Sequence, residues 1–503
     1  MTDLPSSVPA ALEHWAVTTP DAAALTGDWG ADSYRELREQ VLRAVSRLHR
    51  AGVRRGDRVV VAGGNTRWWV YAHLATLRLG AVSVPTNTRL SPAQFGEHAA
   101  ALGASVVLVD EERRRLAAEV RTAPVLDLAG ADDGPVAAEL PPIAEVCAPD
   151  APALISSTSG TTGRPKGAVI SHGALWACAR TFAEQLGLGA DDSTRVLVPL
   201  FHNTGFVDQL ATMLAVGGRT DLLEEFHTRD AVAAFEELGS TYLTAVPSII
   251  RLLMVADGAD AVFSGVRTVL YGGSPMPAAW SAELRRRWPR MRLVHGYGLT
   301  EFTSVVTLLP PDQVEARGES IGRPVPDVDV RIVDDGGAEV DPGRVGELWV
   351  RGATRMTGYW DDPEATAAKL SGGWLRTGDL ARCDAEGWLH VEGRLDDVIN
   401  RGGEKVLPAS VESVLATCPE VAQASVFALP HPILQHRVLA ALEVRPGREF
   451  DERSTRARLG ARLPDYAIPE EFIVMQHLPR TASGKVDRRA VAAAVRAAAG
   501  ADR

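Results

Sequence analysis

Short apolar segments rich in β-branched residues alternate with helical patterns along the first part of the chain. Strands are expected at 58–62, 81–85 and 105–110, with a helix at 66–79. Further along, strands are expected at 195–199, 241–246, 267–271 and 292–295, and helices at 206–216 and 277–288. This alternation is typical of an α/β fold built on mostly parallel sheets.

The pattern of apolar and polar residues changes after about residue 328. Closely spaced strands at 328–333 and 346–351 predict a small β subdomain. The elements expected beyond Arg394 are a helix at 409–416, strands at 424–428 and 437–443, and a terminal helix from Arg488. Since 503 residues exceed the usual size of one hydrophobic core, we expect a large N-terminal domain over 1–395 and a smaller α+β C-terminal domain over 396–503.

A glycine- and hydroxyl-rich run from Thr158 to Gly167 is suited to binding phosphate. Its hydroxyls and glycine-freed backbone N–H groups can converge on anionic oxygens, and Lys166 adds a mobile positive charge. The run lacks the glycine spacing of the common nucleotide-binding loop. It joins an expected strand at 153–155 to another at 168–170, after which Ser171 is expected to cap a helix. The alternative is a solvated surface turn.

Charge and cysteine content limit the possible partners. A net charge of −11 disfavours nonspecific binding to nucleic acid or to an anionic membrane, because both require clustered basic residues. The four cysteines lack the spacing of a zinc site or a disulfide framework, which suits a reducing cytoplasm. The amino terminus shows no export signal, and no apolar run approaches about 18 residues, so we expect no membrane span.

Several further motifs match one family in order and spacing. They are Tyr-Gly-Gly-Ser-Pro at 271–275, His-Gly-Tyr-Gly-Leu-Thr-Glu at 295–301, Arg-Thr-Gly-Asp at 376–379, Gly-Arg-Leu-Asp-Asp at 393–397 and Pro-Arg-Thr-Ala-Ser-Gly-Lys at 479–485. With the phosphate run, they make the chain resemble the adenylate-forming superfamily, which includes acyl-CoA ligases, nonribosomal-peptide adenylation domains and firefly luciferase. The resemblance extends from Ala11 to Lys485 and is closest to stand-alone acyl-CoA ligases.

The resemblance implies an activity in two steps. A small-molecule carboxylic acid attacks the α-phosphorus of ATP and expels pyrophosphate, and the acyl-AMP then passes its acyl group to the thiol of CoA. Two anions meet in the first step, so charge must be neutralised during an in-line displacement. ATP, Mg²⁺ and CoA are therefore the expected cofactors, and the C-terminal domain is expected to rotate between the two steps.

The resemblance assigns phosphate and metal contacts to two motifs. Glu301 is the expected Mg²⁺ ligand, and Thr300 is expected to donate to the α-phosphate. Without the family context, a Thr-Glu pair is more often a helix cap. The residues expected to hold the β- and γ-phosphates are Thr158, Ser159, Gly160, Thr161, Thr162, Gly163 and Lys166.

The resemblance assigns the nucleoside to residues of the large N-terminal domain. Asp379 is expected to accept the ribose hydroxyls, with Arg394 behind it, while Tyr297 and Val391 offer an aromatic and an apolar surface to adenine. The other residues expected at the nucleotide are Gly272, Gly273, Ser274, His295, Gly296 and Gly298. The alternatives are an ordinary turn aspartate and close packing of strand ends.

Three assignments concern the C-terminal domain. Lys485 is expected to contact the carboxylate and the α-phosphate, which makes it a catalytic group with Thr300, Glu301 and His202. Asp396 matches the hinge position. Gly402 and Gly403 are expected to leave space for the pantetheine arm of CoA.

His202 matches the gate between the acyl pocket and the thiol tunnel, although a lone histidine is more often structural. The residues expected to line the acyl pocket are His202, Asn203, Thr204, Phe206, Val207, Pro247, Gly272 and Gly298. Since this set contains neither lysine nor arginine, a second carboxylate would be poorly paired there. We therefore expect an uncharged, apolar acyl body rather than a dicarboxylate.

One segment departs from the family pattern. Gln435 and His436 stand where many relatives carry glycine and glutamate, which bears on the thioester-forming arrangement. Two alternatives to a CoA ligase follow. One is an enzyme that hands its acyl-AMP to a carrier protein or to a separate thioester-forming partner, and the other is a protein that holds an adenylate without turnover.

Overall fold

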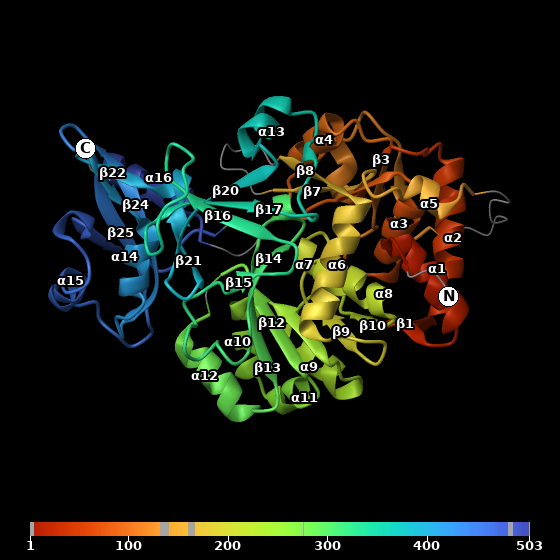
Figure 1. Ribbon diagram of the computed structural model, residues 1–503, viewed down its shortest axis with the longest axis horizontal. Coiled ribbons are helices and arrows are strands. Elements are labelled where there is room, and N and C mark those ends of the chain that lie inside the picture. Colours follow the sequence, from red (N-terminus) through yellow and green to blue (C-terminus); the bar gives the residue numbers. More distant parts are fainter. Residues whose placement is uncertain (1–4, 131–139, 159–165, 275, 481–485, 502–503) are drawn as a thin grey trace. The chain divides into compact units, whose positions relative to one another are not determined.

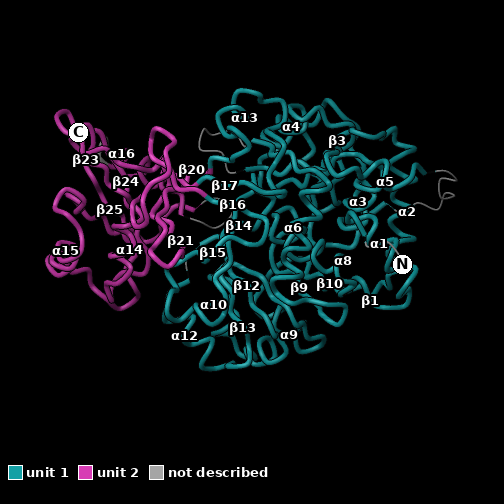
Figure 2. The backbone as a smooth tube through the Cα atoms, viewed as in Figure 1, with its two compact units in different colours: residues 1–330, 349–376 teal, residues 331–348, 377–503 magenta. Residues whose placement is uncertain are grey.

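The computed structural model describes residues 5–130, 140–158, 166–274, 276–480 and 486–501. The chain forms two compact units, one over 1–330 and 349–376 and the other over 331–348 and 377–503 (Figure 2). The division falls inside strand β20 (Trp374–Cys383). The domain boundary expected at 395/396 stays a prediction.

The first unit contains a nine-stranded sheet with a parallel centre and antiparallel edges (Figure 1). In spatial order its strands within the described residues are β15 (Arg323–Pro324), β14 (Val305–Leu309), β13 (Arg292–Gly298), β12 (Thr268–Gly272), β11 (Tyr242–Ala245), β9 (Ser193–Val196), β10 (Arg219–Leu222), β1 (Ala23–Gly27) and β2 (Gly30–Ser33). The strands from β13 to β1 are parallel. The predicted α/β class is confirmed, with sheets that are mixed at their edges.

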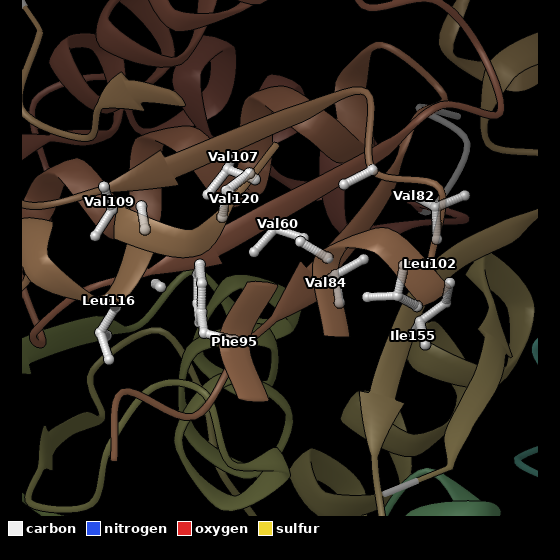
Figure 3. Close-up of a cluster of buried hydrophobic side chains, with 14 of the residues drawn as sticks. Val60, Val82, Val84, Phe95, Leu102, Val107, Val109, Leu116, Val120 and Ile155 are labelled. Atoms are coloured by element: carbon white, nitrogen blue, oxygen red, sulfur yellow. The ribbon is translucent and has the colours of Figure 1, made fainter. Parts of the chain in front are cut away.

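A second sheet of the same unit also has a parallel centre. In spatial order its strands within the described residues are β18 (Gly358–Tyr359), β8 (Gly167–Ser171), β7 (Pro152–Ser157), β4 (Val82–Pro85), β3 (Arg58–Ala62), β5 (Val106–Val109) and β6 (Val125–Asp127). Apolar side chains of this sheet pack with Phe95 of a neighbouring helix and with Leu102, which directly follows that helix (Figure 3). Ile155, which precedes the phosphate run, belongs to this cluster, so the run starts from a rigid base.

Helices of the first unit begin where the sequence supplies capping side chains. Thr66 accepts a hydrogen bond from the Trp69 amide at the start of α3 (Arg67–Arg78), and Ser171 caps α6 (His172–Leu186) as predicted. The other helices of at least eight residues described in this unit are α1 (Val8–Thr18), α2 (Tyr34–Arg50), α4 (Pro92–Ala101), α9 (Thr228–Glu237), α10 (Pro247–Met254) and α12 (Ala278–Arg287).

The helix expected at 206–216 is present, but its first part is π-helical. A short α7 (Asn203–Gly205) leads into a π-helical turn, η2 (Phe206–Ala211), and only then into α8 (Thr212–Val216). A π-turn widens the backbone locally, and such turns are frequent at functional sites. Apolar residues continue through both parts, so hydrophobicity alone could not distinguish them.

The second unit combines β-hairpins with helices. Its strands include β21 (Leu389–Arg394), which pairs with β20, and a sheet of β23 (Glu404–Val406), β22 (Ile399–Arg401), β25 (Gln435–Val444), β24 (Val421–His431) and β26 (Glu471–Val474). The helices α14 (Pro408–Leu415), α15 (Glu452–Gly460) and α16 (Arg488–Ala501) match the expected α+β character. Strands β16 (Asp329–Val333) and β17 (Gly346–Arg351) confirm the two strands expected near them.

In the part of the chain that the structure describes, no helix has both the length and the apolar character needed to cross a bilayer.

Candidate active site

The carboxyl ends of four parallel strands carry most of the residues predicted for the first unit. Because neighbouring parallel strands point the same way, the segments that follow them meet at one edge of the sheet. The segments that follow β9, β11, β12 and β13 contain, respectively, His202 to Thr204, Pro247, Gly273 with Ser274, and Thr300 with Glu301. The fold thus gathers at one edge residues that lie far apart in the sequence.

Close backbone approach explains two of the glycines at this edge. A Cβ atom added to Gly272 would lie 2.6 Å from the Gly296 carbonyl oxygen, and one added to Gly298 would lie 1.5 Å from that of Ser304. A bulge between Tyr297 and Gly298 accompanies the second contact. Close strand packing therefore requires glycine at 272 and 298, and their contact with nucleotide stays a prediction.

A short 3₁₀ turn, η3 (Thr300–Phe302), holds the predicted metal ligand. The residue before it, Leu299, supplies no capping side chain, so Thr300 is not acting as a helix cap. The Glu301 carbonyl accepts a hydrogen bond from the Met356 amide at 2.9 Å. The backbone and the side chain of Glu301 thus both contact residues of the segment that contains β18.

Tyr359 links two of the predicted residues and was not predicted from the sequence. Its hydroxyl donates to Glu301 Oε1 at 2.8 Å, and the Lys166 ammonium lies 5.3 Å from the centre of its ring. Lys166 and Glu301 come from segments far apart in the chain, and Tyr359 comes from a third. No motif in the sequence marks Tyr359, because its importance lies in contacts across the fold.

A buried hydrogen-bond network supports the turn that follows Glu301. Thr303 has a φ of 61°, and its hydroxyl donates to the Thr354 carbonyl at 2.6 Å. The Asn203 amide donates to the Thr303 carbonyl and accepts from the Ser156 hydroxyl, the latter at 3.0 Å. Asn203, predicted as a pocket residue, therefore ties β7 to the turn that carries Glu301.

The two ends of the phosphate run close on each other. The Thr158 amide and hydroxyl both donate to the Lys166 carbonyl, at 2.8 and 3.2 Å. Strands β7 and β8 are antiparallel neighbours, so the predicted strand-to-strand connection is confirmed. Five predicted phosphate contacts lie outside the described residues, namely Ser159, Gly160, Thr161, Thr162 and Gly163, and so does Lys485.

Aromatic rings line one face of β12 and β13. His295 and Tyr271 are cross-strand partners whose rings stack with centroids 4.6 Å apart. Burial lowers the pKa of His295, against the opposing effect of a contact with the Ser320 carbonyl. His295 is therefore neutral near pH 7 and supports the strand, while the half-buried Tyr297 lies two residues further along on the same face.

The predicted acyl-pocket segment changes from half-buried to fully buried along its length. His202, Asn203 and Thr204 are half-buried, whereas Phe206 and Val207 are buried. The Phe206 ring lies 5.5 Å from His73 of α3. The same π-turn carries Asp208, which was not predicted as a site residue. Its side chain is buried, and burial raises its pKa to about 7, against the lowering effect of a hydrogen bond with Ser304.

In the second unit, Asp379 and Arg394 are cross-strand partners in β20 and β21. Arg394 Nη1 lies 2.9 Å from Asp379 Oδ1, and the Asp379 residue is 6% exposed. Val391, on the same hairpin, is exposed. This arrangement places a guanidinium beside a carboxylate, and the contact of either group with ribose stays a prediction.

The predicted hinge lies in the 3₁₀ turn η4 (Leu395–Asp397). Asp396 is exposed. Its neighbour Asp397 forms an ion pair with Arg488 of α16, and Arg488 also binds Glu412 of α14 at 3.0 Å. The chain is thus anchored directly after Asp396.

Gly402 and Gly403 form the turn between β22 and β23. Their φ values are 62° and 97°, which a two-residue hairpin turn of this kind requires. The Gly402 amide donates to the Leu434 carbonyl at 2.8 Å, which joins this turn to the neighbouring hairpin. Gln435 in that hairpin has a φ of 65°, so it adopts the conformation that favours the glycine found in many relatives.

The donor set at Glu301 fits Mg²⁺ bound together with a nucleotide. Among the described residues, no cluster of three or more His, Cys, Asp or Glu side chains could hold a metal by itself. Mg²⁺ is usually bound by one or two carboxylates together with substrate phosphates and water. A single glutamate near a phosphate run meets that requirement.

Comparison with known proteins agrees with this geometry. The family model described as AMP-binding enzyme matches residues 12–360, and that of the AMP-binding enzyme C-terminal domain matches 410–485. The chain is similar to a feruloyl-CoA synthase of Amycolatopsis sp., with 35% identity over 94% of this chain and 97% of that protein.

Two solved structures are also similar. One is the o-succinylbenzoate CoA synthetase of Bacillus subtilis in complex with ATP and magnesium, with 29% identity, a TM-score of 0.84 and coverage of 96% of this chain and 99% of the other. The second is the amide bond synthetase McbA of Marinactinospora thermotolerans, with 31% identity, a TM-score of 0.86 and the same coverage. The chain therefore belongs to the AMP-binding enzymes and is an AMP-forming acyl-CoA ligase of that adenylate-forming family.

Proposed function

We propose that this acyl-CoA ligase activates an uncharged, apolar carboxylic acid at the carboxyl edge of the nine-stranded sheet. The observation that carries the proposal is the grouping of Lys166, Glu301 and Tyr359, in which a cation and a carboxylate contact one tyrosine. ATP requires both charges, since its phosphates need a cation and its Mg²⁺ needs a carboxylate.

In the proposed adenylation step, the substrate carboxylate attacks the α-phosphorus and pyrophosphate leaves. Lys166 and the phosphate run hold the departing pyrophosphate, and Thr300 donates to the α-phosphate. Glu301 would hold Mg²⁺, which supplies charge neutralisation when bound. Lys485 contacts the carboxylate and the α-phosphate, and Asp379 with Arg394 binds the ribose.

In the proposed thioester step, the second domain rotates at Asp396 and brings the turn of Gly402 and Gly403 to the site. His202 gates the passage to the acyl pocket. The positive φ of Gln435 supports this arrangement, because the hairpin keeps the backbone conformation that favours glycine. Among the described residues, the four cysteines form no disulfide bond, which fits the proposed cytoplasmic location.

A different acceptor is the second candidate. The similarity to an amide bond synthetase makes an amine an acceptor to test beside CoA and a carrier protein. The proposal of an apolar acyl body rests on the absence of lysine and arginine among the predicted pocket residues.

The experiment is a pyrophosphate-release screen over alkanoic, aryl, alicyclic and dicarboxylic acids, with and without CoA, with products identified by mass. We expect release with apolar monocarboxylic acids and acyl-CoA when CoA is present. Release without acyl-CoA formation would favour a carrier protein or an amine as acceptor. No release with any acid would support a protein that holds an adenylate without turnover.

Two variants test the assigned roles. Glu301→Gln should remove most pyrophosphate release, whereas Glu315→Gln, a change at an exposed glutamate paired with Arg285, is the matched control and should not. Lys485→Ala should abolish adenylate formation and leave thioester formation from supplied acyl-AMP largely intact. Equal loss of both half-reactions in Lys485→Ala would contradict its assignment.

A further inference from the structure

Tyr359 contacts both predicted charged groups of the phosphate and metal site. Its hydroxyl donates to Glu301 Oε1 at 2.8 Å, and Lys166 Nζ lies 5.3 Å from its ring centre. We propose that Tyr359 is a positioning residue that orients the metal-binding carboxylate of Glu301 and keeps Lys166 beside it without a direct ion pair. This inference rests on the proposed function of Glu301 and Lys166.

The backbone around Tyr359 is held independently of its side chain. Thr357 donates to the Val169 carbonyl at 2.9 Å and Trp360 to the Gly167 carbonyl at 2.7 Å, so β18 is fixed against β8 on both sides of Tyr359. Because these bonds belong to the main chain, a change of the tyrosine side chain should leave β18 in place.

Trp360, which directly follows β18, anchors that strand in the core. It packs against the buried cluster that includes Ile155, and the Arg58 guanidinium lies 5.2 Å from its ring centre. Tyr359 itself is 8% exposed. The tyrosine is therefore presented to Glu301 from a rigid base rather than from a mobile loop.

The two contacts of Tyr359 act on different charges. A hydroxyl that donates to one carboxylate oxygen restricts the rotation of that carboxylate and leaves the other oxygen available to a metal. The face of the aromatic ring attracts an ammonium group. In the described part of the chain no salt bridge joins Lys166 to Glu301, so both charges stay available to a nucleotide.

The test compares Tyr359→Phe with Tyr34→Phe in the full-length protein. Tyr34 is the matched control, because its buried hydroxyl donates to the Gly218 carbonyl at 2.7 Å and lies in α2. ATP binding is measured by calorimetry with and without Mg²⁺, together with the Mg²⁺ dependence of pyrophosphate exchange. We expect Tyr359→Phe to bind ATP normally without Mg²⁺ and to need about tenfold more Mg²⁺ for half-maximal binding, because one charge-assisted hydrogen bond is lost.

Two further variants separate the contacts. Tyr359→Leu also removes the ring, so ATP binding without Mg²⁺ should weaken as well. In a Glu301→Gln background, Tyr359→Phe should add no further change in Mg²⁺ dependence, because the tyrosine acts through that carboxylate.

Several outcomes would overturn the inference. They are an unchanged Mg²⁺ requirement in Tyr359→Phe, an equal shift in Tyr34→Phe, or full additivity with Glu301→Gln. Failure of the wild-type protein to bind ATP would instead contradict the proposed function, so the two failures are distinguishable. Thermal unfolding of each variant shows whether a change in binding follows from a change in folding.

Discussion

Among the turns that hold a residue other than glycine at positive φ, two have opposite surroundings. Thr303, with a φ of 61°, is completely buried and forms hydrogen bonds through both its hydroxyl and its carbonyl. Gln435, with a φ of 65°, is exposed in the β24–β25 hairpin. Such a conformation costs about 1–3 kcal/mol and persists where neighbouring groups determine it. In the buried turn side chains determine it, and in the hairpin the strand pairing does.

The largest expected effect comes from breaking the buried network. Asn203→Ala leaves the Ser156 hydroxyl and the Thr303 carbonyl without their partner, so the free energy of unfolding should fall by about 2–3 kcal/mol. Pyrophosphate exchange should fall by about 100-fold, because Glu301 lies next to the disturbed turn. Denaturant unfolding and exchange kinetics measure both effects.

The control for this prediction lies in the hairpin turn of the second unit. Asn400→Ala removes an exposed hydrogen bond, in which the Gly403 amide donates to Asn400 Oδ1 at 3.1 Å, and should cost less than about 1 kcal/mol. Equal losses of stability in the two variants would remove the distinction between the buried and the exposed turn.

The second prediction concerns Asp208, which bonds with Ser304 beside the buried turn. Burial raises its pKa to about 7, against the lowering effect of that hydrogen bond. Between about pH 4 and pH 7 the unfolded chain loses this proton while the folded protein keeps it, so stability falls as pH rises through that window. Asp208→Asn removes the dependence, so its free energy of unfolding relative to that of the wild type should rise between about pH 4 and pH 7 and change little above pH 7. Parallel stability profiles of variant and wild type would contradict the prediction.

The third prediction replaces Thr303 with glycine. Thr303→Gly relieves the backbone strain but removes the hydroxyl that donates to the Thr354 carbonyl, so we expect a net loss of about 1 kcal/mol. The measurement is the midpoint of denaturant unfolding. A gain in stability would mean that strain outweighs the hydrogen bonds in this turn.

The smallest effect is expected at Gln435. Gln435→Gly relieves strain without removing a buried contact, so stability should rise by about 0.5–1 kcal/mol. The opposite signs expected for Thr303→Gly and Gln435→Gly are the sharpest form of the comparison between the two turns. A loss of stability in Gln435→Gly would show that the glutamine side chain stabilises the hairpin.

Much of the fold could be predicted because strand patterns are local. The strands at 58–62 and 346–351 have the predicted bounds. The helix expected at 206–216 is present, but its π-helical first part could not be predicted, because apolar residues continue through both the π-turn and α8. A hydrophobic pattern reports burial, and it does not report how many residues complete a turn.

The candidate site was predictable only where motifs follow strands. The segments containing Ser274 and Glu301 lie at strand ends as their patterns indicate. Tyr359 could not be found in this way, because its hydrogen bond to Glu301 spans 58 positions of sequence. Asp208 offered a signal, a lone acid in an apolar segment, but its burial and its hydrogen bond with Ser304 depend on contacts across the fold.

The terminal helix α16 begins with Arg488, which forms ion pairs with Asp397 and Glu412. Asp397 directly follows Asp396, the predicted hinge, so the helix is held next to that hinge. Because these ion pairs hold α16 to the second domain, we expect the helix to rotate together with that domain. A fluorophore attached rigidly to this helix would then convert a swing about Asp396 into a change of polarised emission. The polarisation of a fluorophore on α16 would thus report which of the two half-reactions the arrangement of the domains favours.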